Sequence, residues 1–349
     1  MELFDSNCFE CDSMESFLHI ILNGKLEDNS THLYFRGESK YHKYIIPSLY
    51  LNEKLTMISS EYYFRSLLSQ LGSQDYSNSF ELFKLMSEFQ HYGAKTRVLD
   101  ITSNPLIALY FAVEKYCDED LEHGYIYIYG SFPKIDRKDR DGELFDVGHT
   151  VAIKSALNLI PQTKVNAFFS ACKSIKSSLS PDEWNELKNY PIEDLKIGSI
   201  QLNKKKLRIT DDQYYKIQVF IDLLNQRAKT HEILVYPFVI FEDLNRANIV
   251  IPSKCTDRIK QQQGAFIFPK YVFTEDKKFE EIQKEIDDSV STLLTPIITD
   301  DGRRVFVIII PGDKKKRIKE ELSRLGITEG FVYPEIEHRS NALLNNFYN

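Results

Sequence analysis

The chain has 349 residues, of which 42% are hydrophobic and 13% aromatic, and its 44 basic and 51 acidic side chains give a formal net charge of −7. This composition is typical of a folded globular protein and excludes a disordered one. The acidic balance argues against a dedicated surface for nucleic acid or for an anionic membrane. The longest apolar runs, ILVYPFVIF and RVFVIIIP, are much shorter than the roughly 20 residues of a membrane span, so no transmembrane segment is expected.

The cysteines predict a reducing environment. There are five, an odd number, and no charged and apolar leader precedes them. We therefore expect a cytoplasmic protein. Cys8 and Cys11 have the spacing of half a zinc site, but no second pair of Cys or His completes it, so no metal is expected.

The chain up to residue 130 is predicted to alternate helices with strands. Apolar residues spaced three or four apart predict helices over residues 14–24, 59–71 and 78–93. Short apolar runs predict strands over residues 32–37, 96–102 and 124–130. A further helix follows Ser103 or Asn104, either of which can cap it, with Pro105 in the first turn, where a missing N–H costs nothing.

Residues 131–230 are more polar and predominantly helical in pattern. Two helix starts are clearly marked, because Ser180 with Glu183 and Thr210 with Gln213 have the spacing of capping boxes. We expect this stretch to form a helical insertion or subdomain.

Strands return after this stretch. They are predicted over residues 232–241, 248–252, 264–271 and 304–311, with helices over residues 279–294 and 314–326. Because helices cluster between groups of strands, we expect an α+β fold rather than an alternating parallel α/β sheet. The core would be discontinuous, with residues 1–130 and 231–349 on either side of the helical stretch.

The first candidate site is the end of the strand over residues 32–37, which reads Phe35-Arg36-Gly37 and is followed by Glu38. An arginine there presents a planar fork of donors, and a glycine beside it lets a phosphate or carboxylate approach the backbone. The alternative, purely structural interpretation is a partly exposed arginine in a salt bridge, with Gly37 making a turn. From these residues alone the structural interpretation is favoured.

The second candidate site is a group of polar residues just before the helix that starts near Pro105. They are His91, Tyr92, Thr96, Arg97, Asp100, Thr102 and Ser103. Free N–H groups and the positive end of the helix dipole make this a natural place for an anion or a sugar-phosphate edge. The structural alternative is that Asp100 pairs with Arg97 or caps the turn, Thr102 and Ser103 cap the helix, and His91 is a core histidine.

The third candidate site is Gln263-Gly264, at the entrance to the strand over residues 264–271. It would place an amide at the same end of the sheet as Arg36 if the two strands are neighbours. Alternatively, the glutamines form a solvated turn and Gly264 a bulge.

Together these segments resemble the FRG domain family, named for the motif that stands here as Phe35-Arg36-Gly37. The similarity continues through Pro47-Ser48 and through the segments QHYGAKTRVLDITSNPLIALYFA, RIKQQQGAFIF and LSRLGITEGFVYPEIE. It spans almost the whole chain outside residues 131–230.

A more distant resemblance is to ADP-ribosyltransferases, which bind NAD with an arginine ending the first core strand, a Ser-Thr-Ser type element and a glutamate opening a later strand. Arg36 is similar to the first, Thr102-Ser103 to the second, and Gln263 stands where the glutamate would fall. The resemblance implies mixed or antiparallel sheets, NAD as substrate or ligand, and cleavage of NAD or transfer of ADP-ribose to an intracellular protein or nucleic-acid target. It also implies a toxin or antiviral defence context.

The resemblance assigns roles to individual residues. Those assigned to catalysis are Arg36, Thr102, Ser103 and Gln263, and those assigned to ligand binding are Gly37, Glu38, His91, Tyr92, Thr96, Arg97, Asp100 and Gly264. Because a glutamine carries no negative charge to stabilise an oxocarbenium-like transition state, the substitute acid would be Glu38, Glu88 or Asp100. The alternatives are a non-catalytic sensor of a nucleotide or other phosphorylated ligand, and an interaction module with an inert pocket.

Overall fold

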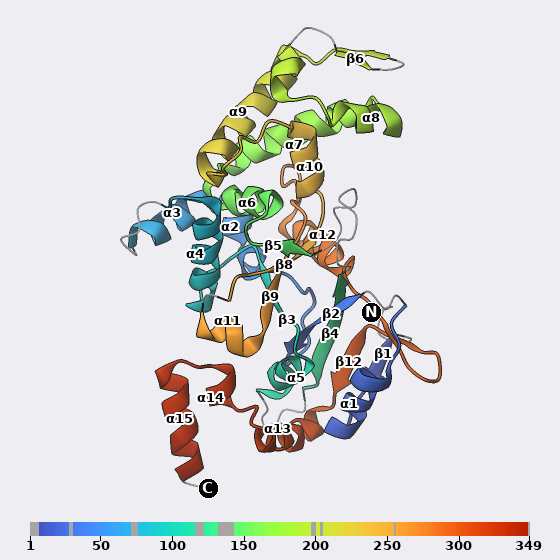
Figure 1. Cartoon of the computed structure of the whole chain (residues 1–349), viewed down its shortest axis with the longest axis vertical. Helices are drawn as coiled ribbons and strands as arrows, with labels where there is room; N and C mark the ends of the chain where they lie inside the picture. Colours follow the sequence, from blue (N-terminus) through green and yellow to red (C-terminus); the bar gives the residue numbers. More distant parts are fainter. Residues whose placement is uncertain are drawn as a thin grey trace.

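The computed structural model describes residues 7–27, 31–70, 76–115, 122–131, 143–196, 200–202, 205–254 and 256–347. Its centre is an eight-stranded mixed sheet, accompanied by two small two-stranded sheets and many helices (Figure 1). The predicted α+β class is therefore confirmed. None of the helices within the described ranges is both long and apolar enough to cross a membrane.

The central sheet has the strand order β1-β12-β4-β2-β3-β9-β8-β5. These strands are β1 (Cys8–Glu10), β2 (His32–Glu38), β3 (Leu99–Thr102), β4 (Gly124–Ser131), β5 (Leu144–Phe145), β8 (Asn248–Ile251), β9 (Gly264–Phe268) and β12 (Val307–Ile310). The two edge pairs are parallel and the inner neighbours are antiparallel. The small sheets pair β6 (Ile200–Leu202) with β7 (Lys205–Leu207), and β10 (Ile297–Ile298) with β11 (Arg304–Val305).

Helices cover both faces of the sheet. One apolar cluster buries Phe35, Ile126 and Ile308 of the sheet against α1 (Met14–Asn23), α5 (Pro105–Val113), α13 (Lys315–Arg324) and α14 (Glu329–Val332). A second cluster buries Phe266 and Phe268 against α3 (Glu61–Gln70) and α4 (Ser79–His91). The tyrosines of β4 belong to a third cluster, which includes Val290 of α12 (Phe279–Ser291).

The remaining elements complete the chain. They are α2 (Glu53–Met57), α11 (Asp257–Gln262), α15 (Ile336–Phe347), and the short 3-10 helices η1 (Ser48–Leu51), η2 (Leu157–Leu159), η3 (Ile192–Lys196) and η4 (Gly312–Lys314). In Figure 1, α15 extends away from the sheet near the C-terminus.

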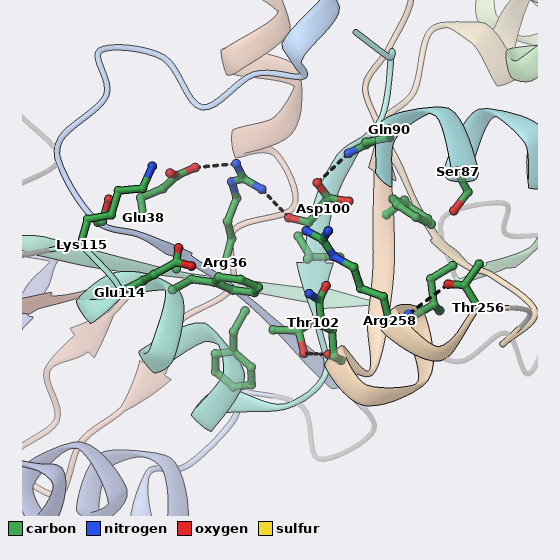
Figure 2. Close-up of a pocket in the computed structure, with 18 residues that line it drawn as sticks. Arg36, Glu38, Ser87, Gln90, Asp100, Thr102, Glu114, Lys115, Thr256 and Arg258 are labelled. Carbon is green, nitrogen blue, oxygen red and sulfur yellow. Dashed lines mark hydrogen bonds and ion pairs between the residues drawn. The ribbon is translucent and has the colours of Figure 1, made fainter. Parts of the chain in front are cut away.

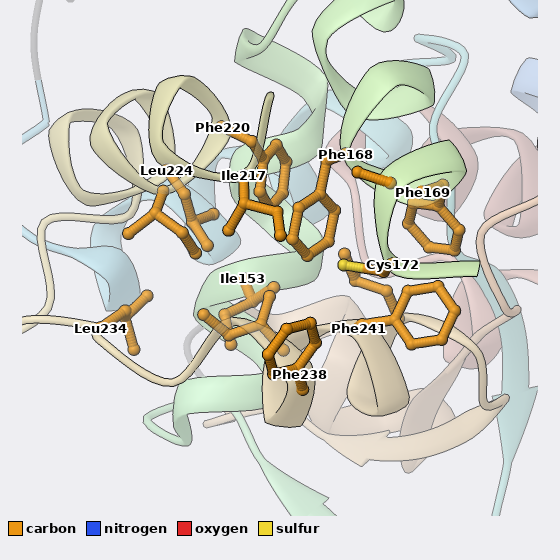
Figure 3. Packing of buried hydrophobic residues seen from close by; sticks show 14 of the residues in the cluster. Ile153, Phe168, Phe169, Cys172, Ile217, Phe220, Leu224, Leu234, Phe238 and Phe241 are labelled. Atoms are coloured by element: carbon orange, nitrogen blue, oxygen red, sulfur yellow. The ribbon is translucent and has the colours of Figure 1, made fainter. Parts of the chain in front are cut away.

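A helical unit stands at one end of the sheet and has its own apolar core (Figure 1). Its helices are α6 (His149–Ala156), α7 (Gln162–Ser177), α8 (Pro181–Leu187), α9 (Asp211–Ala228) and α10 (Pro237–Leu244). Phe168 of α7 stacks on Phe220 of α9 with ring centroids 4.1 Å apart, and both side chains are fully buried (Figure 3). An offset stack of this kind adds about 1 kcal/mol to the area that it buries.

Most of the predicted elements are present. The predicted helices correspond to α1, α3, α4, α5, α12 and α13, and the predicted strands to β2, β3, β4, β8, β9, β11 and β12. Both predicted capping boxes form, at Ser180 and Thr210, and Asn104 caps α5. The run over residues 304–311 divides between two sheets, and β5 joins the central sheet from within residues 131–230. The division into core and insertion stays a prediction.

The strand predicted over residues 232–241 is wrong. The structure has an irregular segment that runs into α10, with Pro237 in the first turn of the helix. Phe238, Phe241 and Leu244 are spaced three apart and are all buried in the core of the helical unit. A short apolar run cannot be assigned to strand or helix by hydrophobicity alone, and here a proline at the helix start decided the outcome.

Two buried cations connect the sheet to the helical unit. Arg97, just before β3, donates to Asn158, Tyr50 and Ser60 at 3.0 Å each. Lys154 of α6 donates from Nζ to the Arg246 carbonyl at 2.5 Å and to the Pro269 carbonyl at 3.3 Å. Burial lowers the pKa of Lys154 to about 7, although Asp243 opposes the shift. Because two carbonyls give partial compensation for a lost hydration shell, this lysine is a costly part of the junction.

Gly37 of β2 is predicted to be essential for packing. A Cβ there would lie 1.9 Å from the Ala108 carbonyl oxygen of α5, whereas a Cβ at Gly264 would meet nothing closer than 3.9 Å. Gly37→Ala should therefore lower the free energy of unfolding by about 2 kcal/mol or more, because a helix backbone has to move. Gly264→Ala is the matched control and should change it by less than about 1 kcal/mol. Urea unfolding measures both, and equal losses would contradict this packing.

The junction predicts a dependence of stability on pH. The pKa of Lys154 in the folded protein is lowered to about 7, below the roughly 10.4 of an unfolded chain. Above pH 7 the unfolded state therefore binds more protons, and the free energy of unfolding rises with pH. Relative to Lys154→Met, wild type should gain up to about 1.4 kcal/mol per pH unit between pH 7 and 9. Denaturation series at several pH values measure this, with Lys164→Met, an exposed lysine of α7, as control. A flat difference would refute it.

Candidate functional site

The candidate site is an opening between two neighbouring strands. β2 pairs with β4 from His32 to Glu38, and β3 pairs with β9 from Leu99 to Thr102. Between β2 and β3, however, the structure has a single pair of residues, Phe35 and Thr102. Beyond this pair the two strands are not paired with each other, although each remains paired with its outer neighbour.

Arg36 bridges the opening. Its Nη1 donates to the Asp100 carbonyl oxygen at 2.7 Å, and its Nη2 lies 2.5 Å from Oε1 of Glu38 (Figure 2). Burial disfavours the charge, but the carboxylates of Glu38 and Asp100 outweigh this and raise the pKa of Arg36. Arg36 is therefore a permanent cation. The salt bridge that the structural interpretation predicts does form, between Arg36 and Glu38, and both residues line a pocket.

A pocket of about 270 Å³ lies over the opening. Its walls come from β2, β3, the second half of α4, the end of α5, and α11 (Figure 2). The charged residues that line it are the cations Arg36, Lys115 and Arg258 and the acids Glu38, Asp100 and Glu114. Such a mixture can hold a ligand that carries both anionic groups and hydroxyl or amide groups.

Asp100 is held by a short relay of hydrogen bonds. The Thr96 hydroxyl donates to Oε1 of Gln90 at 2.5 Å, and Nε2 of Gln90 donates to Oδ2 of Asp100 at 2.6 Å. Thr96 is fully buried, and in this arrangement the N–H end of the Gln90 amide faces the pocket, so Oδ2 of Asp100 accepts the hydrogen bond.

The charge state of Asp100 results from opposing influences. Its side chain is open to the pocket, and the protein around it removes enough water to raise its pKa above the ordinary value. Arg36, the Gln90 amide and Arg258 act in the opposite direction, whereas Glu38 adds to the rise. In Figure 2 the guanidinium of Arg258 extends toward Asp100. The carboxyl group thus lies near two guanidinium groups, whose effect on its pKa opposes that of burial.

Thr102 connects the floor of the pocket to α11. Its hydroxyl donates to the Gln262 carbonyl at 2.6 Å and accepts from the Asn104 N–H at 2.9 Å. Both bonds are structural, because one fixes α11 over the end of β3 and the other fixes the start of α5. Thr102 lines the pocket at the end next to Phe35.

Ser103 and Gln263 contact each other beside the pocket and do not line it. The Ser103 N–H donates to the Gln263 carbonyl at 3.1 Å, and its hydroxyl lies 3.5 Å from Oε1 of Gln263. Gln263 has a φ of 46° and forms the left-handed cap at the end of α11. This residue of the third candidate site therefore ends a helix just before β9 begins. Gln262 is the glutamine that lines the pocket. Of the four residues that the resemblance assigns to catalysis, Arg36 and Thr102 line the pocket, whereas Ser103 and Gln263 do not.

The other predicted ligand residues have different positions. Arg97 points away from the pocket into the junction described above, and Gly264 pairs with Thr102 in the sheet. Tyr92 follows α4 and is 84% exposed. His91 is the last residue of α4, and its side chain lies outside the described residues.

Gly37 lines the pocket, but its missing side chain clears space for α5 rather than for a ligand.

Eight polar pocket residues were not singled out from the sequence. They are Ser39 after β2, Ser87 and Gln90 of α4, Glu114 and Lys115 after α5, and Thr256, Arg258 and Gln262 along α11 and its cap. For α11 a signal was present, because Thr256 has the position of a helix cap and its hydroxyl accepts from the Ile259 N–H. The others are recognisable only once α4 and the end of α5 are known to face β3.

Comparison with models of protein families gives a match in the N-terminal part of the chain. Residues 31–121 match the family model of the FRG domain. The chain therefore contains an FRG domain, and the match covers Arg36-Gly37, Asp100 and Thr102 but ends well before α11. No curated protein and no solved structure matches the chain.

Within the described ranges, no group of three or more His, Cys, Asp or Glu side chains is arranged to hold a metal ion. Cys11 is a free thiol there, and Cys117 and Cys255 lie outside the described residues.

The relay around Asp100 predicts two opposite shifts of its pKa. Gln90→Leu removes a hydrogen bond to the charged form and should raise the pKa of Asp100 further. Glu38→Gln removes a neighbouring negative charge and should lower it. Carboxyl 13C NMR titration of Asp100 measures both variants. Shifts of the same sign would show that the relay does not control this carboxyl group.

Proposed function

We propose that the pocket binds NAD and breaks its nicotinamide–ribose bond, with water or an intracellular target as the acceptor of the ADP-ribose. The observation that carries this proposal is the position of Asp100 beside Arg36 in the opening between β2 and β3. A carboxylate next to a fixed guanidinium offers one group for a ribose hydroxyl and another for the adjoining phosphate.

The chemistry requires the protein to stabilise charge, while water or the target supplies the nucleophile. As the bond between C1′ and the nicotinamide nitrogen breaks, nicotinamide leaves with the electron pair and positive charge develops on the ribose. A preorganised carboxylate near C1′ stabilises that charge. Asp100 is the acid best suited to this role, because Gln90 fixes its orientation while Glu38 is engaged by Arg36. Water or another nucleophile then adds to C1′ and loses a proton.

The size of the pocket is compatible with half of the dinucleotide. At about 270 Å³ it is slightly below the roughly 300–1,000 Å³ of small-molecule sites. It accommodates nicotinamide, its ribose and one phosphate better than the whole molecule. In this proposal Arg36 binds the phosphate on the nicotinamide side, and Thr102 acts by holding α11 against the pocket.

The test is release of nicotinamide from NAD by the purified chain. Arg36→Ala and Asp100→Asn should each lower kcat/KM by about 100-fold or more, because each removes a charge that acts in the transition state. Asp100→Asn is nearly isosteric and can still accept from Gln90, so it leaves the fold intact. Arg65→Ala changes an exposed arginine of α3 and should have no effect. Melting temperatures identify any variant that fails to fold.

A second candidate function is a sensor that binds a nucleotide without cleaving it. It is favoured by Gln263, which stands where the resemblance would place a glutamate and is engaged by Ser103. Binding of NAD that depends on Arg36, with no nicotinamide released, would support the sensor and refute the enzyme. If neither release nor binding depends on Arg36, both functions are refuted.

A further inference from the structure

A second cavity adjoins the first. It has a volume of about 380 Å³ and is lined by Glu88, Tyr92, Thr256, Asp257, Arg258, Pro334 and Glu335. Thr256 and Arg258 line both cavities. The two spaces therefore share part of their wall at the start of α11, which forms the junction between them.

Arg258 stands at this junction. Its guanidinium lies over the ring of Tyr333 at 4.8 Å, and its Nη1 is 3.7 Å from Oε1 of Glu335. The aromatic ring fixes the plane of the guanidinium, whereas an ion pair at this distance is weak. An anionic ligand can therefore displace Glu335 and keep the arginine in the same orientation. The guanidinium also extends toward Asp100 (Figure 2), so a group bound here is next to the first pocket.

The far part of the second cavity differs chemically from the junction. Tyr92 presents an exposed ring on which a planar base can stack. The carboxylates of Glu88, Asp257 and Glu335 accept hydrogen bonds from hydroxyl and amino groups and repel phosphates. This end suits a neutral nucleoside, and the arginine at the junction suits the phosphates before it.

We propose that the second cavity binds the adenosine half of NAD, with the diphosphate held at Arg258 and the adenine on Tyr92. This inference rests on the proposed function, because it extends the ligand of the first pocket. It adds a specificity: NADP carries a third phosphate on the adenosine ribose, which would enter the carboxylate-lined space, so NAD is the preferred dinucleotide.

Calorimetric titration with fragments of the ligand tests this division. ADP-ribose reaches both cavities, whereas nicotinamide mononucleotide ends at its phosphate and stays in the first. Arg258→Ala should weaken binding of ADP-ribose about 10-fold or more, the effect of one charge-assisted contact. Tyr92→Ala should weaken it about 5-fold or more and leave nicotinamide mononucleotide unchanged. NADP should bind or react at least 10-fold less well than NAD.

Two matched controls are available in the chain. Arg304 is also paired with a glutamate and stacked on an aromatic ring, but it belongs to β11, and Arg304→Ala should leave all these affinities unchanged. Tyr62 is 82% exposed on α3, and Tyr62→Ala should likewise have no effect.

If the Arg258 and Tyr92 variants bind ADP-ribose like wild type while nicotinamide release still depends on Arg36, the second cavity is not the adenosine site and the proposed function stands. Equal use of NAD and NADP would also overturn the inference. If wild type binds none of these ligands and releases no nicotinamide, the proposed function and this inference are both refuted.

Discussion

The separation of β2 from β3 is the feature on which the rest of the site depends. A sheet normally satisfies the N–H and C=O groups of adjoining strands by pairing them, and unpaired groups in the interior are costly. Here the two strands share the single pair Phe35 and Thr102. Next to this pair, the Arg36 side chain donates a hydrogen bond to the Asp100 carbonyl in place of a backbone N–H. The guanidinium is thus part of the sheet and part of the pocket at once. This explains why an apolar strand carries an arginine near its end.

The helices around the opening determine what the pocket can bind. α4 contributes the amide that orients Asp100, the end of α5 contributes one acid and one cation, and α11 contributes Arg258. α11 is itself held from two sides, by the bond from Thr102 to the Gln262 carbonyl and by the bond from Gln262 to the Val332 carbonyl at 3.1 Å. The C-terminal elements therefore support the pocket although they contribute little to its lining.

Local signals in the sequence were sufficient for most elements and for the centre of the site. Caps such as Asn104 and Ser180, and the periodic apolar residues, depend on neighbours in the chain and could be predicted. Arg36 stood out as a charged residue near the end of an apolar strand, and Asp100 and Thr102 stood out as polar residues just before the start of a helix. Gln90, Lys115 and Arg258 did not, because their importance comes from which helix faces which strand. α10 was mistaken for a strand because its burial on several sides hides the helical period.

The bond between Thr102 and Gln262 joins residues that are 160 positions apart in the chain. The part that matches the FRG family supplies β2 and β3, but β9, which covers the other edge of β3, comes from residues 264–268. A fragment limited to the matched part would present β3 as an open edge, the kind of surface that recruits other strands and leads to aggregation. The part of this chain that matches the FRG family is therefore not a self-contained module. The outer edge of β3 is paired only when β9, from the distant half of the chain, has folded against it.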